Sequence, residues 1–151
     1  MAIVETIDDV AQAVLERTIR EERTTMQLIN ILVADDNAFM RNFLDRLFRQ
    51  AGYHVEFASN GEELIQKALA AVPALVLTDL EMPLVDGSEA IRQLRNDART
   101  ASVPMLLFSS REDGAPLARA AGADEFIAKP FTNNDLLSRV SAHLIRASVY
   151  Q

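Results

Sequence analysis

Short hydrophobic runs and longer segments of mixed polarity alternate along most of the chain. The hydrophobic runs occupy Ile29–Ala34, His54–Ala58, Ala74–Thr78, Pro104–Phe108 and Glu125–Ala128. The first, third and fourth runs are almost continuously apolar, which is typical of parallel strands that are buried on both faces. The pattern therefore predicts five strands of one parallel sheet.

Segments of helix length separate these runs, and their apolar residues recur three and four positions apart, as on one face of a helix. Examples of this spacing are Phe43 with Leu47, Leu64 with Ala68, and Leu136 with Val140. Because strand and helix alternate five times, the predicted fold class is α/β, with a doubly wound five-stranded parallel sheet.

Several helix boundaries carry their own signals. Ser59 followed by Glu62, and Thr132 followed by Asp135, have the spacing of capping boxes, in which a hydroxyl caps the helix start. Gly122 stands where a helix end needs a left-handed residue. We therefore expect helices to begin after residues 59 and 132 and to end before residue 122.

Residues 1–28 form a separate segment, before a domain at 29–147 and a short tail at 148–151. An extra N-terminal amphipathic helix is predicted here, because one helical face is apolar and the other is charged. The apolar positions are Ile3, Ile7, Val10, Ala11, Val14, Leu15 and Ile19. The helix either folds back on its own domain, links to another part of a larger protein, or pairs with a second copy. A membrane surface is disfavoured because the polar face is not enriched in Lys or Arg.

Composition narrows the classes of function. The chain has 151 residues, a net charge of -7 and no cysteine. The length suits one domain with an appendage, and the lack of cysteine excludes disulfides and thiolate metal sites. The negative charge argues against direct binding to nucleic acid or anionic membranes. The N-terminus lacks the basic region of a signal peptide, so we expect a cytoplasmic protein.

Three acids fall at the carboxyl ends of predicted strands, where ligands bind in open α/β sheets. Asp35 and Asp36 follow the first strand, and Asp79 follows the third. A lone aspartate usually starts a turn, but three that converge repel one another unless a cation neutralises them. Oxygen ligands favour a hard ion such as Mg²⁺, with Mn²⁺ as an alternative. Asp79 could then accept a phosphoryl group as a nucleophile.

Two further strand ends supply groups for an anion. The fourth strand ends in Ser109 and Ser110, whose hydroxyls can donate hydrogen bonds, and Lys129 ends the fifth, where its ammonium can pair with a phosphate. Together these motifs resemble the receiver domain of two-component response regulators, which has a flavodoxin-like fold. The resemblance spans about Ile29 to Ala147 and rests on Asp35-Asp36, Thr78-Asp79-Leu80-Glu81-Met82-Pro83, Asp86-Gly87, Ser109-Ser110 and Ala128-Lys129-Pro130-Phe131.

The resemblance implies a role for each matching position. Asp79 matches the phosphoacceptor, Asp36 the direct Mg²⁺ ligand, Asp35 its acidic neighbour, and the backbone carbonyl of Glu81 a further ligand. Lys129 matches the residue that pairs with the phosphoryl oxygen.

The resemblance also implies a conformational switch. Ser109 matches the hydroxyl that moves to the phosphoryl group, and Phe126 matches the aromatic residue whose ring turns inward when it does. Glu81 and Arg111 lie two residues after Asp79 and Ser109, at the rim of the predicted site. They either form an ion pair that hinders attacking water or remain two solvated side chains, as exposed pairs usually are.

The predicted function is a phosphorylation-activated switch, which is not a turnover enzyme. A histidine kinase or a histidine phosphotransfer protein would phosphorylate it, and a changed face at Ser110–Gly122 and Phe126–Arg146 would act on a protein partner. Homodimers could form through that face or through residues 1–28. Since only Ser148–Gln151 follow the last predicted helix, we expect a stand-alone receiver resembling chemotaxis regulators. The alternatives are a phosphorylation-independent scaffold or a receiver fragment of a hybrid signalling protein.

Overall fold

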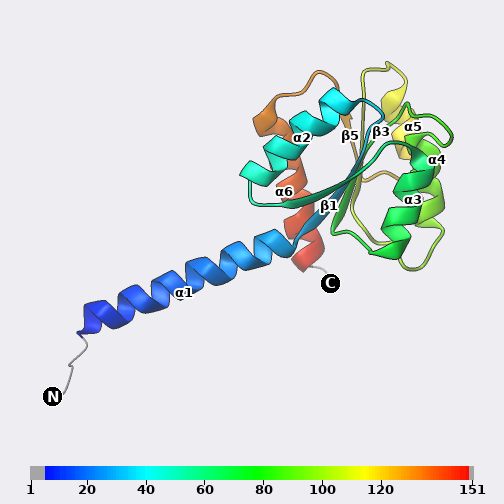
Figure 1. The fold of residues 1–151 in the computed structure, drawn as a ribbon. Helices are drawn as coiled ribbons and strands as arrows, with labels where there is room; N and C mark the ends of the chain where they lie inside the picture. The colour runs from blue at the N-terminus through cyan, green and yellow to red at the C-terminus, as the bar shows by residue number, and fades with distance from the viewer. Residues whose placement is uncertain (1–5, 150–151) are drawn as a thin grey trace.

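The computed structural model describes residues 6–149, apart from the side chains of residues 22–28 and 149. A parallel sheet forms its centre, with strands in the order β2-β1-β3-β4-β5. Helices α2 and α6 cover one face and α3, α4 and α5 cover the other (Figure 1). The predicted doubly wound α/β fold is confirmed.

The strands are β1 (Asn30–Ala34), β2 (His54–Ala58), β3 (Leu75–Asp79), β4 (Met105–Ser109) and β5 (Glu125–Ala128). The helices are α1 (Ile7–Leu28), α2 (Ala38–Gln50), α3 (Gly61–Ala70), α4 (Gly87–Arg95), α5 (Gly114–Ala121) and α6 (Asn133–Val149). Two strands run one residue further than the hydrophobic pattern predicts, because Asp79 pairs with Phe108 and Ser109 pairs with Ala128. Helix α6 passes the predicted end at residue 147, since residues 146–149 contain no helix-breaking residue.

Alternation along the strands creates two hydrophobic cores. In β1, Ile31 and Val33 pack with α2 and α6, while Leu32 packs on the opposite side with α3, α4 and α5. Strands β1, β3 and β4 are buried on both faces, which explains why their sequences are almost wholly apolar. The polar ends of these strands are therefore the places where the sheet meets solvent.

One predicted capping box is wrong by one residue. The cap of α3 is Asn60, whose side-chain oxygen accepts a hydrogen bond from the backbone N–H of Glu63 at 2.8 Å. Ser59 instead donates its hydroxyl hydrogen bond to the Glu63 carboxylate. Both residue types cap helices well, so the sequence pattern did not distinguish them.

The other predicted boundaries are confirmed. The backbone N–H of Asp135 donates to the Thr132 hydroxyl at 3.1 Å, at the start of α6. Gly122 ends α5 with φ at 98°, in the left-handed region that glycine adopts without strain.

Helix α1 extends away from the sheet instead of folding back on it (Figure 1). It contacts β2, and its C-terminal end is the part that lies nearest the sheet (Figure 1). The apolar residues Ile7, Val10, Val14, Leu15 and Ile19 are all exposed, and Ile7 is 88% exposed. Ile3 lies outside the described residues. Among the described helices, none is long and apolar enough to cross a membrane.

Candidate functional site

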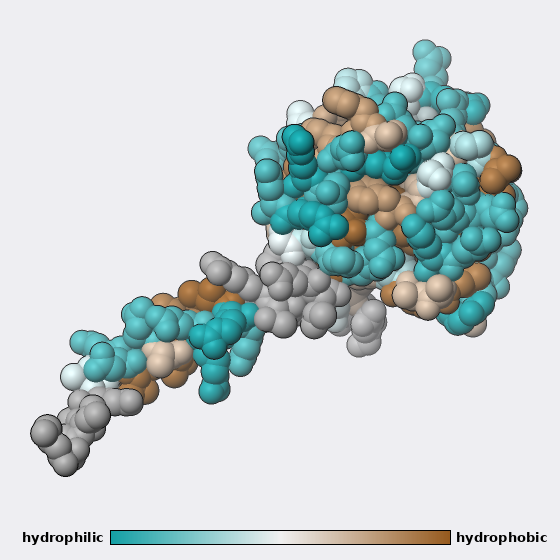
Figure 2. Space-filling model, in the orientation of Figure 1, coloured by the Kyte–Doolittle hydropathy of each residue, from teal (hydrophilic) through white to brown (hydrophobic). Residues whose placement is uncertain are grey.

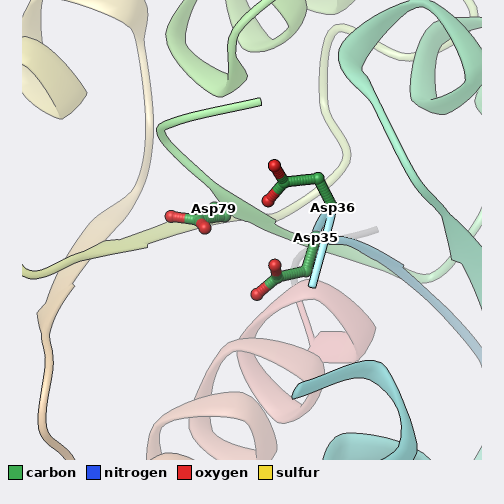
Figure 3. A group of neighbouring side chains, drawn as sticks. All are labelled: Asp35, Asp36 and Asp79. Atoms are coloured by element: carbon green, nitrogen blue, oxygen red, sulfur yellow. The ribbon is translucent and has the colours of Figure 1, made fainter. Parts of the chain in front are cut away.

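The sheet order places the site between β1 and β3. Connections run to opposite sides of the sheet from these two strands, so the loops after them separate and leave a crevice at their carboxyl ends. Figure 3 shows Asp35 and Asp36 entering this crevice from the end of β1 and Asp79 entering it from the end of β3. One carboxylate oxygen from each lies within 4.8 Å of the other two. The structure thus brings the three predicted acids together.

Lys129 joins the acids from the end of β5. Its Nζ lies 3.4 Å from Asp79 Oδ2 and 3.9 Å from Asp35 Oδ2. The ammonium also lies over the Phe108 ring, 4.4 Å from its centre, where the ring face attracts a positive charge. A single lysine therefore faces two of three converging carboxyl groups.

Burial raises the pKa of both Asp35 and Asp79 above the ordinary value for aspartate. Lys129 opposes this shift in each case, but loss of hydration outweighs it. Asp35 is only 1% exposed at its side chain, and its Oδ2 accepts no hydrogen bond. Lys129 is too far from that oxygen for a hydrogen bond, so one carboxylate oxygen of the cluster is buried without one.

This arrangement fits a divalent cation. The donors are oxygen atoms, the acids outnumber the ammonium, and a buried carboxylate oxygen has no hydrogen-bond donor. Hard ions such as Mg²⁺ bind such oxygen sets with water completing the coordination. Asp36 is exposed and Asp79 nearly buried, so the cluster is open on the side of Asp36.

Backbone contacts fix the two acids in place. The Asn37 N–H donates to Asp35 Oδ1 at 2.9 Å, and the Arg41 guanidinium donates to the Asp35 carbonyl at 2.8 Å. A β-carbon on Gly87 would lie 2.0 Å from the Asp79 carbonyl oxygen, so only glycine allows α4 to start this close to β3. The sequence pattern missed Asn37 and Arg41. Asn37 carries a usable signal, since it caps α2 directly after the acids.

Ser109 ends β4, the strand beside β3, and Arg111 follows in the loop after it. Ser109 is buried at the end of β4, and its Oγ accepts a hydrogen bond from the Arg111 N–H at 3.0 Å. The Arg111 guanidinium lies 3.5 Å from the Glu81 carboxylate. It also makes two shorter hydrogen bonds, of 2.8 and 2.7 Å, to Asp113. Arg111 thus bridges the rim, and Asp113 competes with Glu81 for it.

Phe126 lies in β5 beside Ser109's strand. Its ring is partly buried against the core on the side of α3, α4 and α5. The distal ring edge packs on Gly114, the first residue of α5. The candidate switch residues therefore sit between the acid cluster and α5.

Comparisons with known proteins agree with this geometry. The family model of the response regulator receiver domain matches residues 31–141. The chain is 38% identical over 120 residues to the transcriptional regulatory protein ResD of Bacillus subtilis (strain 168). That alignment covers 78% of this chain and 49% of ResD, so the chain spans about half the length of this curated relative.

Solved structures share the fold. A response regulator from Chloroflexus aurantiacus is 29% identical, with a TM-score of 0.74 over 77% of this chain and 97% of that one. The receiver domain of the sensor histidine kinase PA1611 from Pseudomonas aeruginosa PAO1 is 23% identical, with a TM-score of 0.73. The alignment covers 76% of this chain and 96% of that domain.

Asp79→Asn should stabilise the metal-free protein at neutral pH. Because burial raises the pKa of this carboxyl, the folded state holds its proton more tightly, and stability falls as the pH rises through that pKa. We expect the free energy of unfolding to rise by on the order of 1 kcal/mol. Urea unfolding with EDTA measures it, and the gain should vanish as the pH falls below the ordinary value of 3.8.

Asp97→Asn is the matched control. Hydrogen bonds from Arg99 lower the pKa of Asp97 to about 2, so its ionised form favours folding. This variant should gain no stability at neutral pH. A destabilised Asp79→Asn protein would contradict the interpretation that burial dominates at Asp79.

Proposed function

Because the chain belongs to the family of response regulator receiver domains in two-component signalling, we propose that it is a switch phosphorylated on Asp79. The observation that carries the proposal is the position of Asp79 between two further acids and Lys129. A carboxylate there can attack phosphorus while Lys129 neutralises the incoming charge. The phosphoryl group held on Asp79 is itself the proposed signal, so we propose a switch and not a turnover enzyme.

The proposed reaction transfers a phosphoryl group from a phosphohistidine of the donor protein to Asp79. An oxygen of Asp79 forms a bond to phosphorus as the phosphorus–nitrogen bond to the donor imidazole breaks, and the imidazole leaves with the electron pair. Lys129 faces the Asp79 oxygen and attracts the anionic product. Asp35, Asp36 and Asp79 would hold Mg²⁺, or Mn²⁺, which would offset the charge of the phosphoryl oxygens. The PA1611 receiver domain was crystallised with magnesium coordinated in its active-site cleft.

A groove beside the site suits a phosphodonor protein, either a histidine kinase or a histidine phosphotransfer protein. It has a volume of about 400 Å³ and is lined by Phe39, Phe43 and Phe131 together with Lys129. Phe39 is 80% exposed. Since Lys129 belongs to both the groove and the acid cluster, a protein bound in the groove would present its phosphohistidine to Asp79. We propose that the transfer of the phosphoryl group to Asp79 takes place in the cytoplasm.

The phosphorylated protein would signal through the face formed by α5, β5 and α6. A phosphoryl group adds negative charge beside Lys129 and Ser109, and a bistable element must convert this into a new surface. Helix α5 is the shortest helix in the described part of the chain, and among its residues only Ala118, Ala121 and Gly114 are buried. Few buried apolar contacts hold it in place, as is typical of elements that move. A downstream protein would bind the altered face.

Intact mass measured after incubation with acetyl phosphate and Mg²⁺ tests the proposal. A single phosphoryl adduct should form, and it should be absent in Asp79→Asn and in the presence of EDTA. An adduct on the Asp79→Asn variant would move the phosphorylation site elsewhere. No adduct on the folded wild-type protein would favour a phosphorylation-independent scaffold.

Arg111→Ala should increase the rate of dephosphorylation. Arg111 and Glu81 meet across the rim, and we propose that they hinder water from approaching the acyl phosphate. Because exposed ion pairs contribute little, we expect a rise of about two- to fivefold, measured by loss of the adduct mass. Asp113→Asn should have the opposite effect, since it frees Arg111 for Glu81.

Arg119→Ala is the matched control for this pair. It removes an exposed arginine from the last turn of α5, away from the rim. Equal dephosphorylation rates in Arg111→Ala, Arg119→Ala and wild type would leave Glu81 and Arg111 as two solvated side chains.

Helix α1 is proposed to pair with α1 of a second copy. Figure 2 shows hydrophobic residues gathered along the free helix. The helix carries acids at 8, 9, 16, 21 and 22 and arginines at 17, 20 and 23, so acids outnumber arginines. This excess of acids disfavours an anionic lipid surface, which leaves a second copy of the apolar stripe as the proposed partner.

Leu15→Glu should shift the dimer towards monomer, as measured by sedimentation across micromolar concentrations. The new carboxylate would be buried in the apolar stripe without a partner. Ala13→Glu adds the same charge on the opposite helical face and should leave the association unchanged. A monomeric wild-type protein, or equal effects of the two variants, would contradict pairing through α1.

A further inference from the structure

Gly114 lies against the distal edge of the Phe126 ring. A β-carbon on Gly114 would be 2.6 Å from Cε2 and 2.7 Å from Cζ of that ring, and 3.4 Å from the β-carbon of Ser109. Carbon atoms that are not bonded pack at about 3.5–4.0 Å. The ring in its present position and a side chain at residue 114 therefore exclude each other.

The backbone gives no other reason for glycine at this position. Gly114 begins a helix, and the glycines with left-handed φ are Gly52 and Gly122. An L-residue can adopt helical backbone angles, and within a helix glycine is less stable than alanine. The close contacts of Gly61 and Gly87 are with carbonyl oxygens of other segments, whereas those of Gly114 are with ring atoms.

We propose that Gly114 is a positioning residue for Phe126, and that the missing side chain at 114 creates the space that the ring occupies. This inference rests on the proposed function in one respect, namely that the position of the ring reports the phosphorylation state. The space is bordered by Ser109 and Phe126, so the candidate switch hydroxyl, the ring and the start of α5 share one small volume.

The loop between Ser109 and Gly114 gives this volume a direct link to the site. Ser109 Oγ accepts a hydrogen bond from the Arg111 N–H, and the Gly114 N–H donates to the Arg111 carbonyl at 3.2 Å. A movement of Ser109 towards a phosphoryl group would break or redirect the first of these bonds. The second would then shift Gly114 relative to the ring, which changes the space available to Phe126.

A double-mutant cycle in the unphosphorylated protein tests the contact. Gly114→Ala should lower the urea midpoint when Phe126 is present, because the new methyl group meets the ring. Phe126→Leu removes both Cε2 and Cζ, so in that background Gly114→Ala should leave the midpoint unchanged or raise it. Additive effects of the two substitutions would overturn the proposal.

Ala115→Gly is the matched control, as it makes the reverse exchange at the next position of the same helix. Its effect on the urea midpoint should be the same with either residue at 126. Coupling as large as that of Gly114→Ala would show a general response of α5 and would also overturn the proposal.

Fluorine NMR then follows the ring itself. With para-fluorophenylalanine incorporated, the Phe126 resonance is assigned by its loss in Phe126→Leu. Gly114→Ala should shift this resonance without any phosphodonor, and an unshifted resonance would overturn the proposal. The cycle and this comparison need no phosphorylation, so a failure of acetyl phosphate labelling would refute the proposed function and leave Gly114 to be judged by its own results.

Discussion

Electrostatic repulsion is the main constraint on the site, because three carboxyl groups meet at the end of a buried sheet with one lysine among them. Burial removes hydration that stabilises the ionised carboxylates, and the positive charge of Lys129 offsets only part of that loss. The surrounding structure holds the groups in this unfavourable arrangement through contacts to their backbone, from Arg41 and at Gly87. Stability is given up locally at a site whose charges suit the cation and the anionic phosphoryl group of the proposed function.

The crowded acids lie on rigid strands, but the site also borders a short helix that has few buried residues. The acids stand on β1 and β3, whose residues are buried on both faces and cannot shift without disrupting both cores. Ser109 stands on β4, which is equally buried, but the loop that follows it leads to the short helix α5. A change in charge at the rigid acids is therefore relieved most easily through that loop.

Much of this could be predicted from the sequence, because buried parallel strands have a clear hydrophobic signature and acids directly follow two of them. The one-residue errors at Asp79 and Ser109 arose because a polar residue can still pair in the sheet at the end of a strand. Asn60 was missed because Ser59 is an equally good cap. The course of α1 could not be predicted, since an amphipathic pattern shows that a partner is needed and not which partner it is.

Contacts made by glycine are the least predictable part, because they depend on what the fold brings near a missing side chain. Gly87 and Gly114 look alike in the sequence, yet one admits a backbone carbonyl and the other an aromatic ring. The difference matters for the proposed switch, because Phe126 lacks the hydroxyl of tyrosine and only packing would then report the position of its ring. A signal that passes through packing needs a volume that two groups compete for. In this protein the ring and the start of α5 compete for the volume beside Ser109, and the glycine at 114 decides that the ring occupies it.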